Sequence, residues 1–506
     1  GFSWKSSWTK CCLAWHMFHW FAFAYFANGW FGFFVKEIKE NEDCFVLTKD
    51  QEKSLELFCE WLSTPYSFKP FVMKGFAGSG KTYLSMKFLK KVDDSGLCWT
   101  VVAPTHKAVG VLREGLKSES IQPTWFPSTI HRLLRLKLKR QADVEICEKT
   151  DQTENSLENL GLVLVDEASM IDSKLLEITL ECARCNSTRL VFVGDPAQLP
   201  PVGESFSSVF LMKRSVNTEL REVVRHQGPV LKLAKLIRNG QIPCTQLPIL
   251  PVVESLKGSV GILDRNSWLE KAKSSLRLSS LEDDYDRARI LCYTNRIVDN
   301  LVPHARRAIH GEMADQYQVL PGEVLISRKA VMVNASLKED EIGEEPDILI
   351  SSNREMVVED VIPNSFDLDS LGIHQDFENT LPVIETQIVR VSCDQKEYSL
   401  RLMPQIGSKS RKDLDLFLDM LSITARERGK KNSASIWKLF FFIRDSFASL
   451  GPASVLTIHR SQGSTFGDVF ITSDVFWPRN IEFRKRLVYV AVSRASKGVW
   501  IVGDKK

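Results

Sequence analysis

The sequence predicts an α/β fold built on a buried parallel sheet, and three segments carry this prediction. Residues 71–82, FVMKGFAGSGKT, are a short apolar run followed by a glycine-rich loop of the form GxxxxGKT. Residues 162–169, LVLVDEAS, are an apolar run that ends in two acids, and residues 190–193, LVFV, lead into GDPAQLPPV. Continuous apolar runs bounded by polar residues are typical of strands buried on both faces. We therefore expect the polar residues to meet at one edge of the sheet.

Length and composition predict a globular protein of several domains. The chain has 506 residues, 44% of them hydrophobic and 25% charged, so we expect roughly two to four domains. With 66 basic and 63 acidic residues the net charge is only +3, and a polyanionic partner would have to meet local basic stripes. The eleven cysteines form no disulfide framework, and the CxxC at Cys182 and Cys185 lacks the remaining ligands of a zinc site. We interpret them as reduced thiols inside a cell.

The first 46 residues differ from the rest in composition. Residues 11–34, CCLAWHMFHWFAFAYFANGWFGFF, contain no Lys, Arg, Asp or Glu and are long enough to cross a membrane. They are rich in Trp and Phe rather than Leu, Ile and Val, and the chain begins with Gly1 instead of Met. We interpret the segment as translated upstream sequence or a fragment end, and a membrane anchor stays open as the alternative.

The glycine-rich loop predicts a nucleotide site with ATP and Mg²⁺ as cofactors. A P-loop lies between a strand and a helix, as this one is expected to do. The glycines Gly75, Gly78 and Gly80 let backbone N–H groups close around phosphate oxygens. Lys81 can reach the β- and γ-phosphates, and the hydroxyl of Thr82 can bind Mg²⁺. The helix that follows points its positive end at the same phosphates.

The other two strand ends complete the predicted nucleotide site. Asp166 is expected to hold a water or ligand of Mg²⁺ without binding the ion directly. Glu167 is expected to be the base that orients the attacking water. Asp195 and Gln198 follow the third strand, where a sensor of the γ-phosphate is expected. Upstream, Gln51 lies in the first turn of a helix. By itself it is typical of an exposed helix residue, and a contact with the adenine edge is the second interpretation.

Further motifs follow in a definite order along the chain. They are APTHKAVGVL at 103–112, STIHRLL at 128–134, LREVVRH at 220–226, CYTNRIVDNL at 292–301, VLTIHRSQGSTFGDV at 455–469 and LVYVAVSRAS at 487–496. Together with the P-loop, VDEAS and GDPAQLPP, this order resembles the superfamily-one helicases, and more narrowly their RecD-like branch. The resemblance runs from about residue 47 to the C-terminus. It implies two RecA-like motor domains, with ATP between them and single-stranded DNA across both.

The resemblance also implies roles for individual residues. Arg225 and Arg494 are implied to reach the γ-phosphate, one from each motor domain, so that hydrolysis depends on closure. We predict Arg494 to follow a strand, LVYVAV, and to precede a helix. Gly463 and Gly467 are expected to permit close backbone approach. Contacts to the DNA backbone, which position a strand without reading its sequence, are implied for Thr105, His106, Lys107, Thr129, His131, Thr457, His459, Ser461 and Gln462.

The expected domain organisation is discontinuous. The first motor domain is predicted over residues 47–239, and the second over 240–328 and 451–506, with an insertion at 329–450. The first half of this insertion has short β-branched runs, which we interpret as a small Src-homology-three-like barrel, and the second half has a helical pattern. Its basic run RERGKK is either a phosphate contact or a solvated face.

A hairpin is predicted to leave the first motor domain at about residues 135–158. The resemblance implies that this is the pin that splits the duplex. An aromatic residue is expected in relatives, whereas the candidates here are Ile146 and Cys147.

The resemblance implies an ATP-dependent helicase that moves 5′ to 3′ on single-stranded DNA and unwinds duplexes in replication, recombination or repair. A nucleic-acid-stimulated ATPase that remodels protein–DNA complexes, and an RNA helicase, stay open as alternatives. A non-motor P-loop protein would leave Arg494 and the second motor domain unexplained. Expected partners are single-stranded DNA and duplex junctions, with a single-strand-binding protein or replisome component as a further candidate and no membrane. We expect action in the cytoplasm, which for a phage-encoded protein is that of the host.

Overall fold

The computed structural model describes residues 47–141, 144–222, 228–241, 250–335, 348–369, 381–427 and 433–503. The chain divides into two compact units, residues 1–52 and residues 53–506. The aromatic segment predicted to be non-native lies outside the described residues. Among the helices that are described, none combines the length and the apolar character needed to cross a membrane.

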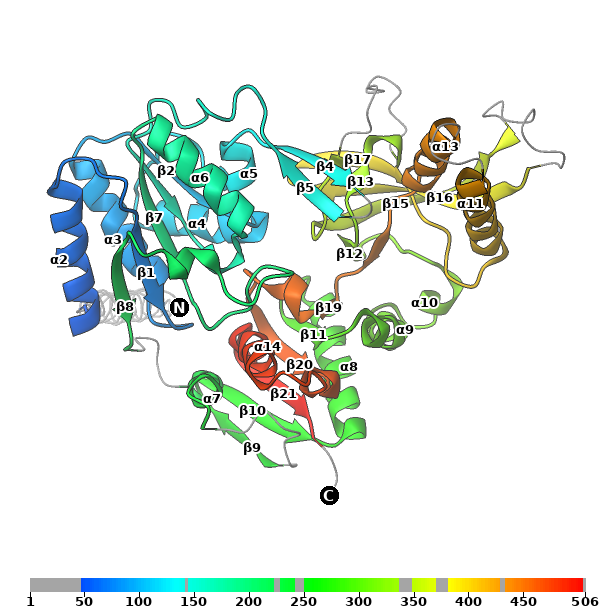
Figure 1. Ribbon diagram of the computed structural model, residues 1–506. Coiled ribbons are helices and arrows are strands. Elements are labelled where there is room, and N and C mark those ends of the chain that lie inside the picture. Colours follow the sequence, from blue (N-terminus) through cyan, green and yellow to red (C-terminus); the bar gives the residue numbers. More distant parts are fainter. Residues whose placement is uncertain are drawn as a thin grey trace, which may run out of the picture. The chain divides into compact units, whose positions relative to one another are not determined.

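The domain predicted as the first motor domain, and called so below, is a parallel sheet covered by helices on both faces (Figure 1). Its described strands run in the order β3-β2-β6-β7-β1-β8, and each neighbouring pair is parallel. Phe71 and Met73 of β1 face one core, while Val72 between them faces the other. This alternation explains the unbroken apolar runs. The strands are β1 (Phe71–Gly75), β2 (Trp99–Ala103), β3 (Ser128–Thr129), β6 (Leu162–Val165), β7 (Arg189–Gly194) and β8 (Val216–Leu220), and the helices are α2 (Lys49–Ser63), α3 (Lys81–Asp94), α4 (His106–Ser118), α5 (Ile130–Leu133) and α6 (Ser173–Cys185).

The second motor domain is built in the same way from segments far apart in the sequence. Its described strands run in the order β19-β11-β20-β21-β10-β9, parallel except for the β9–β10 pair. Helices α7 and α14 pack on one face and α8 and α9 on the other. The strands are β9 (Leu250–Ser255), β10 (Gly258–Leu263), β11 (Ala288–Cys292), β19 (Val455–Thr457), β20 (Phe466–Ile471) and β21 (Ala495–Val502), and the helices are α7 (Pro229–Arg238), α8 (Arg265–Leu281), α9 (Asn295–His310), α10 (Met313–Gln316) and α14 (Ile481–Ser493).

One element differs from the sequence prediction. The run LVYVAV, predicted as a strand, belongs to helix α14, and Arg494 lies at the end of that helix and before strand β21. All residues from Leu487 to Val492 are buried. A helix that is apolar all round lies inside a protein, and a short apolar run of this kind has no periodicity that separates helix from strand.

The two insertions contain antiparallel structure. In the first, β4 (Lys137–Gln141) pairs with β5 (Val144–Glu148) as the predicted hairpin. In the second, the described strands run in the order β17-β16-β15-β12-β18. The two edges of this sheet meet, because Ala448 N donates to Arg401 O at 2.7 Å and Met403 N donates to Ala448 O at 3.0 Å. The elements are β12 (Val324–Ser327), β13 (Val331–Met332), β14 (Ile348–Ile350), β15 (Glu355–Asp367), β16 (Val383–Cys393), β17 (Lys396–Arg401), β18 (Leu450–Pro452), α11 (Lys409–Glu427) and α13 (Ala434–Asp445).

Candidate nucleotide site and nucleic-acid groove

The P-loop is closed around its own lysine. Gly78 and Gly80 both have φ of 80°, a left-handed conformation that glycine adopts without strain. A Cβ on Gly75 would lie 2.6 Å from Ser79 Oγ, so the start of the loop has no room for a side chain. Lys81 Nζ donates to the carbonyl of Gly75 at 3.0 Å and to that of Phe76 at 2.8 Å. The ammonium group therefore lies where phosphate oxygens are expected to bind.

The two acids after β6 lie beside this lysine. Burial, and next the Glu167 carboxylate, raise the pKa of Asp166 to about 7, while the Lys81 charge opposes that rise. Asp166 Oδ1 accepts a hydrogen bond from Glu167 N at 2.8 Å. Among the described residues, the buried Oε2 of Glu167 has no hydrogen-bond partner. A buried carboxylate pair of this kind fits a bound cation, which with Thr82 would be Mg²⁺.

The two residues predicted to sense the γ-phosphate differ in their surroundings. Asp195 is fully buried and binds residues from the second motor domain: Tyr489 Oη donates to Asp195 Oδ2 at 2.6 Å, and Arg238 Nη2 lies 3.4 Å from Asp195 Oδ1. The buried Oε1 of Gln198, by contrast, meets no donor in the described part of the chain. The amide oxygen of Gln198 can therefore accept a hydrogen bond from a water or a ligand, whereas the Asp195 carboxylate is already bound. Sequence reasoning did not identify Tyr489 or Arg238, although a phenol within an otherwise apolar run was a visible signal.

Two of the remaining predicted nucleotide residues have other contacts in the structure. Arg494 donates to Ser464 O at 3.1 Å through Nη1 and to Ser493 Oγ at 3.1 Å through Nη2. Arg225 lies outside the described residues. Gln51, in the first unit, accepts from Thr48 N through Oε1 at 3.1 Å, and its own N–H donates to Thr48 Oγ1 at 3.3 Å. Gln51 therefore takes part in the cap at the start of α2.

A groove of about 550 Å³ lies between the two motor domains and the insertion. Its walls also include residues 351–355 of the insertion and Cys147 of the hairpin. Two other residues predicted to contact DNA, Thr457 and Ser461, are buried with 8% and 0% exposure and are not among the lining residues. The predicted DNA contacts that line the groove are Thr105, His106, Lys107, Thr129, His131, His459 and Gln462.

The hairpin places its two wedge candidates within a strand. Ile146 and Cys147 pair with Lys139 and Leu138 in the β4–β5 ladder. The side chain of Ile146 lies outside the described residues, so Cys147 is the candidate that the structure places at the groove.

Threonines at helix starts and neutral histidines line much of the groove. Thr105 Oγ1 accepts from Ala108 N at the start of α4, and Thr129 Oγ1 accepts from Arg132 N at the start of α5. Burial lowers the pKa of His131 and of His459. These imidazoles are therefore neutral at pH 7 and can bind phosphate oxygens only as single N–H donors.

Lys107 connects three parts of the molecule. Its Nζ lies 2.9 Å from Asp286 Oδ1 in the second motor domain and 3.7 Å from Glu355 Oε2 in the insertion. The same ammonium lies 4.8 Å from the centre of the Phe466 ring. A phosphate that binds Lys107 must therefore compete with two carboxylates.

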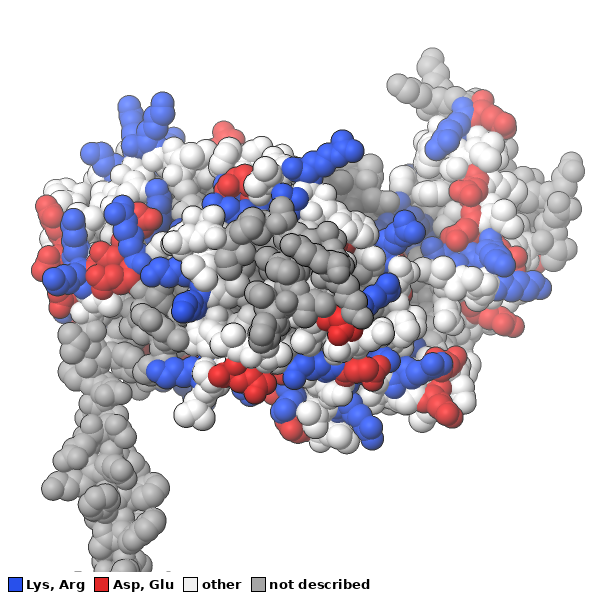
Figure 2. Space-filling view, turned by 90° about the horizontal axis from the view of Figure 1, so that it is seen from below, with Lys and Arg blue, Asp and Glu red and all other residues white. Residues whose placement is uncertain are grey.

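Charge on the surface is mixed. Figure 2 shows a face on which basic and acidic side chains alternate over the described residues, without a broad region of one sign. This agrees with the small net charge of +3. Attraction of a polyanion therefore depends on local groups such as those in the groove.

Known proteins resemble this chain over most of its length. The AAA domain family matches residues 57–250, and the UvrD-like helicase C-terminal domain family matches residues 452–502. The ATP-dependent DNA helicase dda of Enterobacteria phage T4 is 24% identical over 438 residues, covering 85% of this chain and 93% of that protein. The ATP-dependent RecD2 DNA helicase of Deinococcus radiodurans is 28% identical over 176 residues, which are 34% of this chain and 22% of that protein. A crystal structure of Bacteroides Pif1 bound to ssDNA aligns with 90% of this chain and 92% of its own, with 16% identity and a TM-score of 0.44.

Proposed function

From the premise that the chain is a superfamily-one helicase of the RecD-like type, we propose that it hydrolyses ATP to move 5′ to 3′ along single-stranded DNA and to separate duplexes. The observation that supports this proposal is that the candidate nucleotide residues and the groove lie on the same boundary between the two domains. Tyr489 and Asp195 meet across that boundary beside the P-loop. Lys107 and Asp286 meet across it in the groove. A change in the placement of the two domains at one site therefore moves the walls of the other.

The residues of the nucleotide site divide the chemistry among them. The P-loop amides and Lys81 hold the phosphates, and Glu167, whose buried oxygen lacks a protein partner among the described residues, orients the attacking water. Thr82 and Asp166 would hold Mg²⁺, which neutralises charge on the phosphate oxygens. Arg494 must leave Ser464 O and Ser493 Oγ before it can reach a phosphate. Hydrolysis therefore waits for a rearrangement at the domain boundary.

Movement along DNA needs two grips that alternate. One set, including Thr105 and His131, lies in the first motor domain, and the other, including His459 and Gln462, lies in the second. If one set holds the strand while ATP draws the domains together, and the other holds it while they separate, each cycle advances the strand in one direction. The contacts are to the backbone and do not depend on sequence.

The test compares two DNA duplexes that differ only in the tail, one with a 5′ and one with a 3′ single-stranded extension. With ATP and Mg²⁺ we expect strand separation of the 5′-tailed duplex, and none with Glu167→Gln. Separation of the 3′-tailed duplex alone would overturn the polarity. DNA-stimulated hydrolysis without strand separation would favour the remodelling function, and preferential separation of a tailed RNA duplex would favour RNA as the substrate.

The proposal extends to the setting in which the protein acts. A DNA motor of this kind meets single-stranded DNA and duplex junctions, so a single-strand-binding protein or a replisome component is a candidate protein partner. The cytoplasm is the proposed location. Binding of the full chain to a DNA-coated surface with and without a single-strand-binding protein tests the first of these points.

A further inference from the structure

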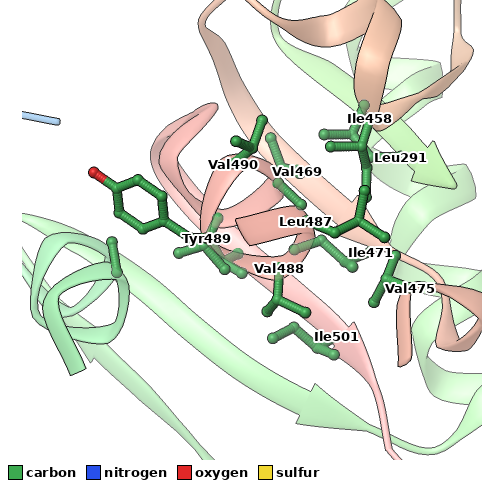
Figure 3. Packing of buried hydrophobic residues seen from close by; sticks show 14 of the residues in the cluster. Leu291, Ile458, Val469, Ile471, Val475, Leu487, Val488, Tyr489, Val490 and Ile501 are labelled. Carbon is green, nitrogen blue, oxygen red and sulfur yellow. The ribbon is translucent and has the colours of Figure 1, made fainter. Parts of the chain in front are cut away.

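Tyr489 is a buried tyrosine of the second motor domain, and its hydroxyl forms hydrogen bonds with two residues of the first. It lies in the middle of α14 and is 2% exposed. Figure 3 shows its ring at the border of the apolar cluster, with the hydroxyl pointing away from Val488 and Val490. That hydroxyl donates to Asp195 Oδ2 at 2.6 Å and accepts from Ala77 N at 3.0 Å. Both bonds therefore cross the boundary between the motor domains.

The two partners of Tyr489 belong to the nucleotide site. Ala77 is a residue of the P-loop, and its N–H is one of the backbone donors next to the expected phosphate position. Asp195 follows β7 and its Oδ1 also accepts from Ala197 N at 3.0 Å. One phenol thus connects the P-loop to the segment that carries Gln198.

The phenol can make these bonds only as a neutral donor. Burial, and next the Asp195 carboxylate, raise the pKa of Tyr489, so the proton stays on the tyrosine. A buried hydroxyl without a partner is unfavourable. If the motor domains moved apart, the Tyr489 hydroxyl, the Asp195 carboxylate and the Ala77 N–H would each lose a partner together.

Arg238 strengthens this connection from a second element. It lies at the end of α7, which packs with α14 in one core. Its guanidinium lies 3.3 Å from the centre of the Phe76 ring, next to Ala77, and 3.4 Å from Asp195. Two side chains of the second motor domain thus hold the same corner of the P-loop.

We propose that Tyr489 is a positioning residue that links the conformation of the P-loop to the placement of the second motor domain. The proposal rests on the proposed function, because it describes how nucleotide binding at the P-loop changes the position of the second motor domain, which contacts DNA. Nucleotide that engages the P-loop amides must change the bond to Ala77. The bond to Asp195 then transmits the change to α14, whose last turn carries Ser493 and is followed by Arg494.

The decisive variant is Tyr489→Phe, which removes one oxygen and keeps the ring. Tyr66→Phe is the matched control, because Tyr66 donates to Ala183 O at 3.1 Å entirely within the first motor domain. In the full chain without nucleotide or DNA, hydrogen exchange of the peptide that contains Ala77 is measured by mass spectrometry. We expect about tenfold faster exchange there in Tyr489→Phe, the effect of losing a bond that protects a buried amide, and no change in Tyr66→Phe.

A second readout separates positioning from structure. In Tyr489→Phe we expect the kcat of DNA-stimulated hydrolysis to fall about tenfold while KM for ATP changes less than about twofold. Asp195→Asn, which keeps the shape of the partner, should lower kcat as well, and the double variant should be no worse than the more impaired single one. Additive losses would overturn the link between the two residues.

The exchange experiment needs no activity, so it decides the proposal separately from the function. Wild-type protein that is not stimulated by DNA would refute the proposed function and leave the Ala77 result to be judged by itself. Unchanged exchange at Ala77 in a folded Tyr489→Phe protein would overturn the proposed link, even if unwinding is confirmed. If Tyr489→Phe does not fold, the same exchange measurement on Asp195→Asn takes its place, with wild-type protection at Ala77 counting against the proposal.

Discussion

A side chain at Gly463 of the second motor domain would meet Thr105 of the first, and Gly463→Ala tests this approach of the two domains. Gly463 has φ of 75°, and a Cβ there would lie 2.9 Å from Thr105 Oγ1 of the first motor domain. The left-handed conformation makes alanine unfavourable by about 1 kcal/mol. To relieve the contact, Thr105 must turn its hydroxyl away from Ala108 N, and losing such a cap costs about 1 kcal/mol more.

The control variant separates these two effects. Gly407 has φ of 89°, and no atom lies within 4 Å of the Cβ position, so Gly407→Ala introduces the backbone strain without the contact. We expect Gly463→Ala to weaken single-stranded DNA binding about fivefold relative to Gly407→Ala, which corresponds to the extra 1 kcal/mol. Fluorescence anisotropy with a labelled oligonucleotide measures both affinities. Equal affinities for the two variants would refute the close approach of the domains at Gly463.

Three further predictions concern charged groups. Lys81→Ala should lose ATP binding, whereas Glu167→Gln should bind ATP almost as the wild type does and hydrolyse it at least about 100-fold more slowly, which nucleotide titration and a phosphate-release assay distinguish. The pKa of Asp166 is raised from 3.8 to about 7, so the native state holds an extra proton between these pH values. The Mg²⁺-free protein should therefore lose stability as pH rises from about 4 to about 7, and thermal unfolding should show that Asp166→Asn removes this loss. Identical pH profiles of wild type and variant would contradict the buried-carboxyl interpretation. Asp286→Asn should remove the nearer of the two carboxylates beside Lys107 and strengthen DNA binding about two- to threefold at low salt. A weaker affinity would mean that the ion pair holds the groove in its binding shape.

The sequence predicted the strands that carry the candidate nucleotide site, because this information is local. The P-loop, the acids after β6 and the segment after β7 each lie within a few residues of the strand that positions them. Parallel strands place their carboxyl ends at one edge, so three local patterns predicted one site. Strands β1, β6 and β7 follow from the apolar runs of these segments.

The sequence could not predict contacts between distant segments. Tyr489 and Asp195 are 294 positions apart, and no local pattern indicates that they meet. Residues 487–492 of helix α14 were interpreted as a strand because they form a run of buried residues without a polar face. Helix α7 was predicted to belong to the first motor domain, yet its apolar residues pack in the core of the second. An amphipathic pattern shows that one face of a helix is buried, but it does not show which domain that face packs against.

The pairing of β12 with β18 has a consequence for the order of folding. These strands pair in antiparallel fashion, with Leu325 opposite Pro452 and Ser327 opposite Leu450. The chain therefore leaves the second motor domain for the insertion and returns to it at neighbouring points. β11 and β19 must also pair, although the whole insertion separates them in the sequence. Closing a long loop is entropically unfavourable, and the penalty grows with its length. If β12 and β18 pair first, the chain that remains to be closed between β11 and β19 is short. The C-terminal strands of the second sheet then add to it at a small entropic cost.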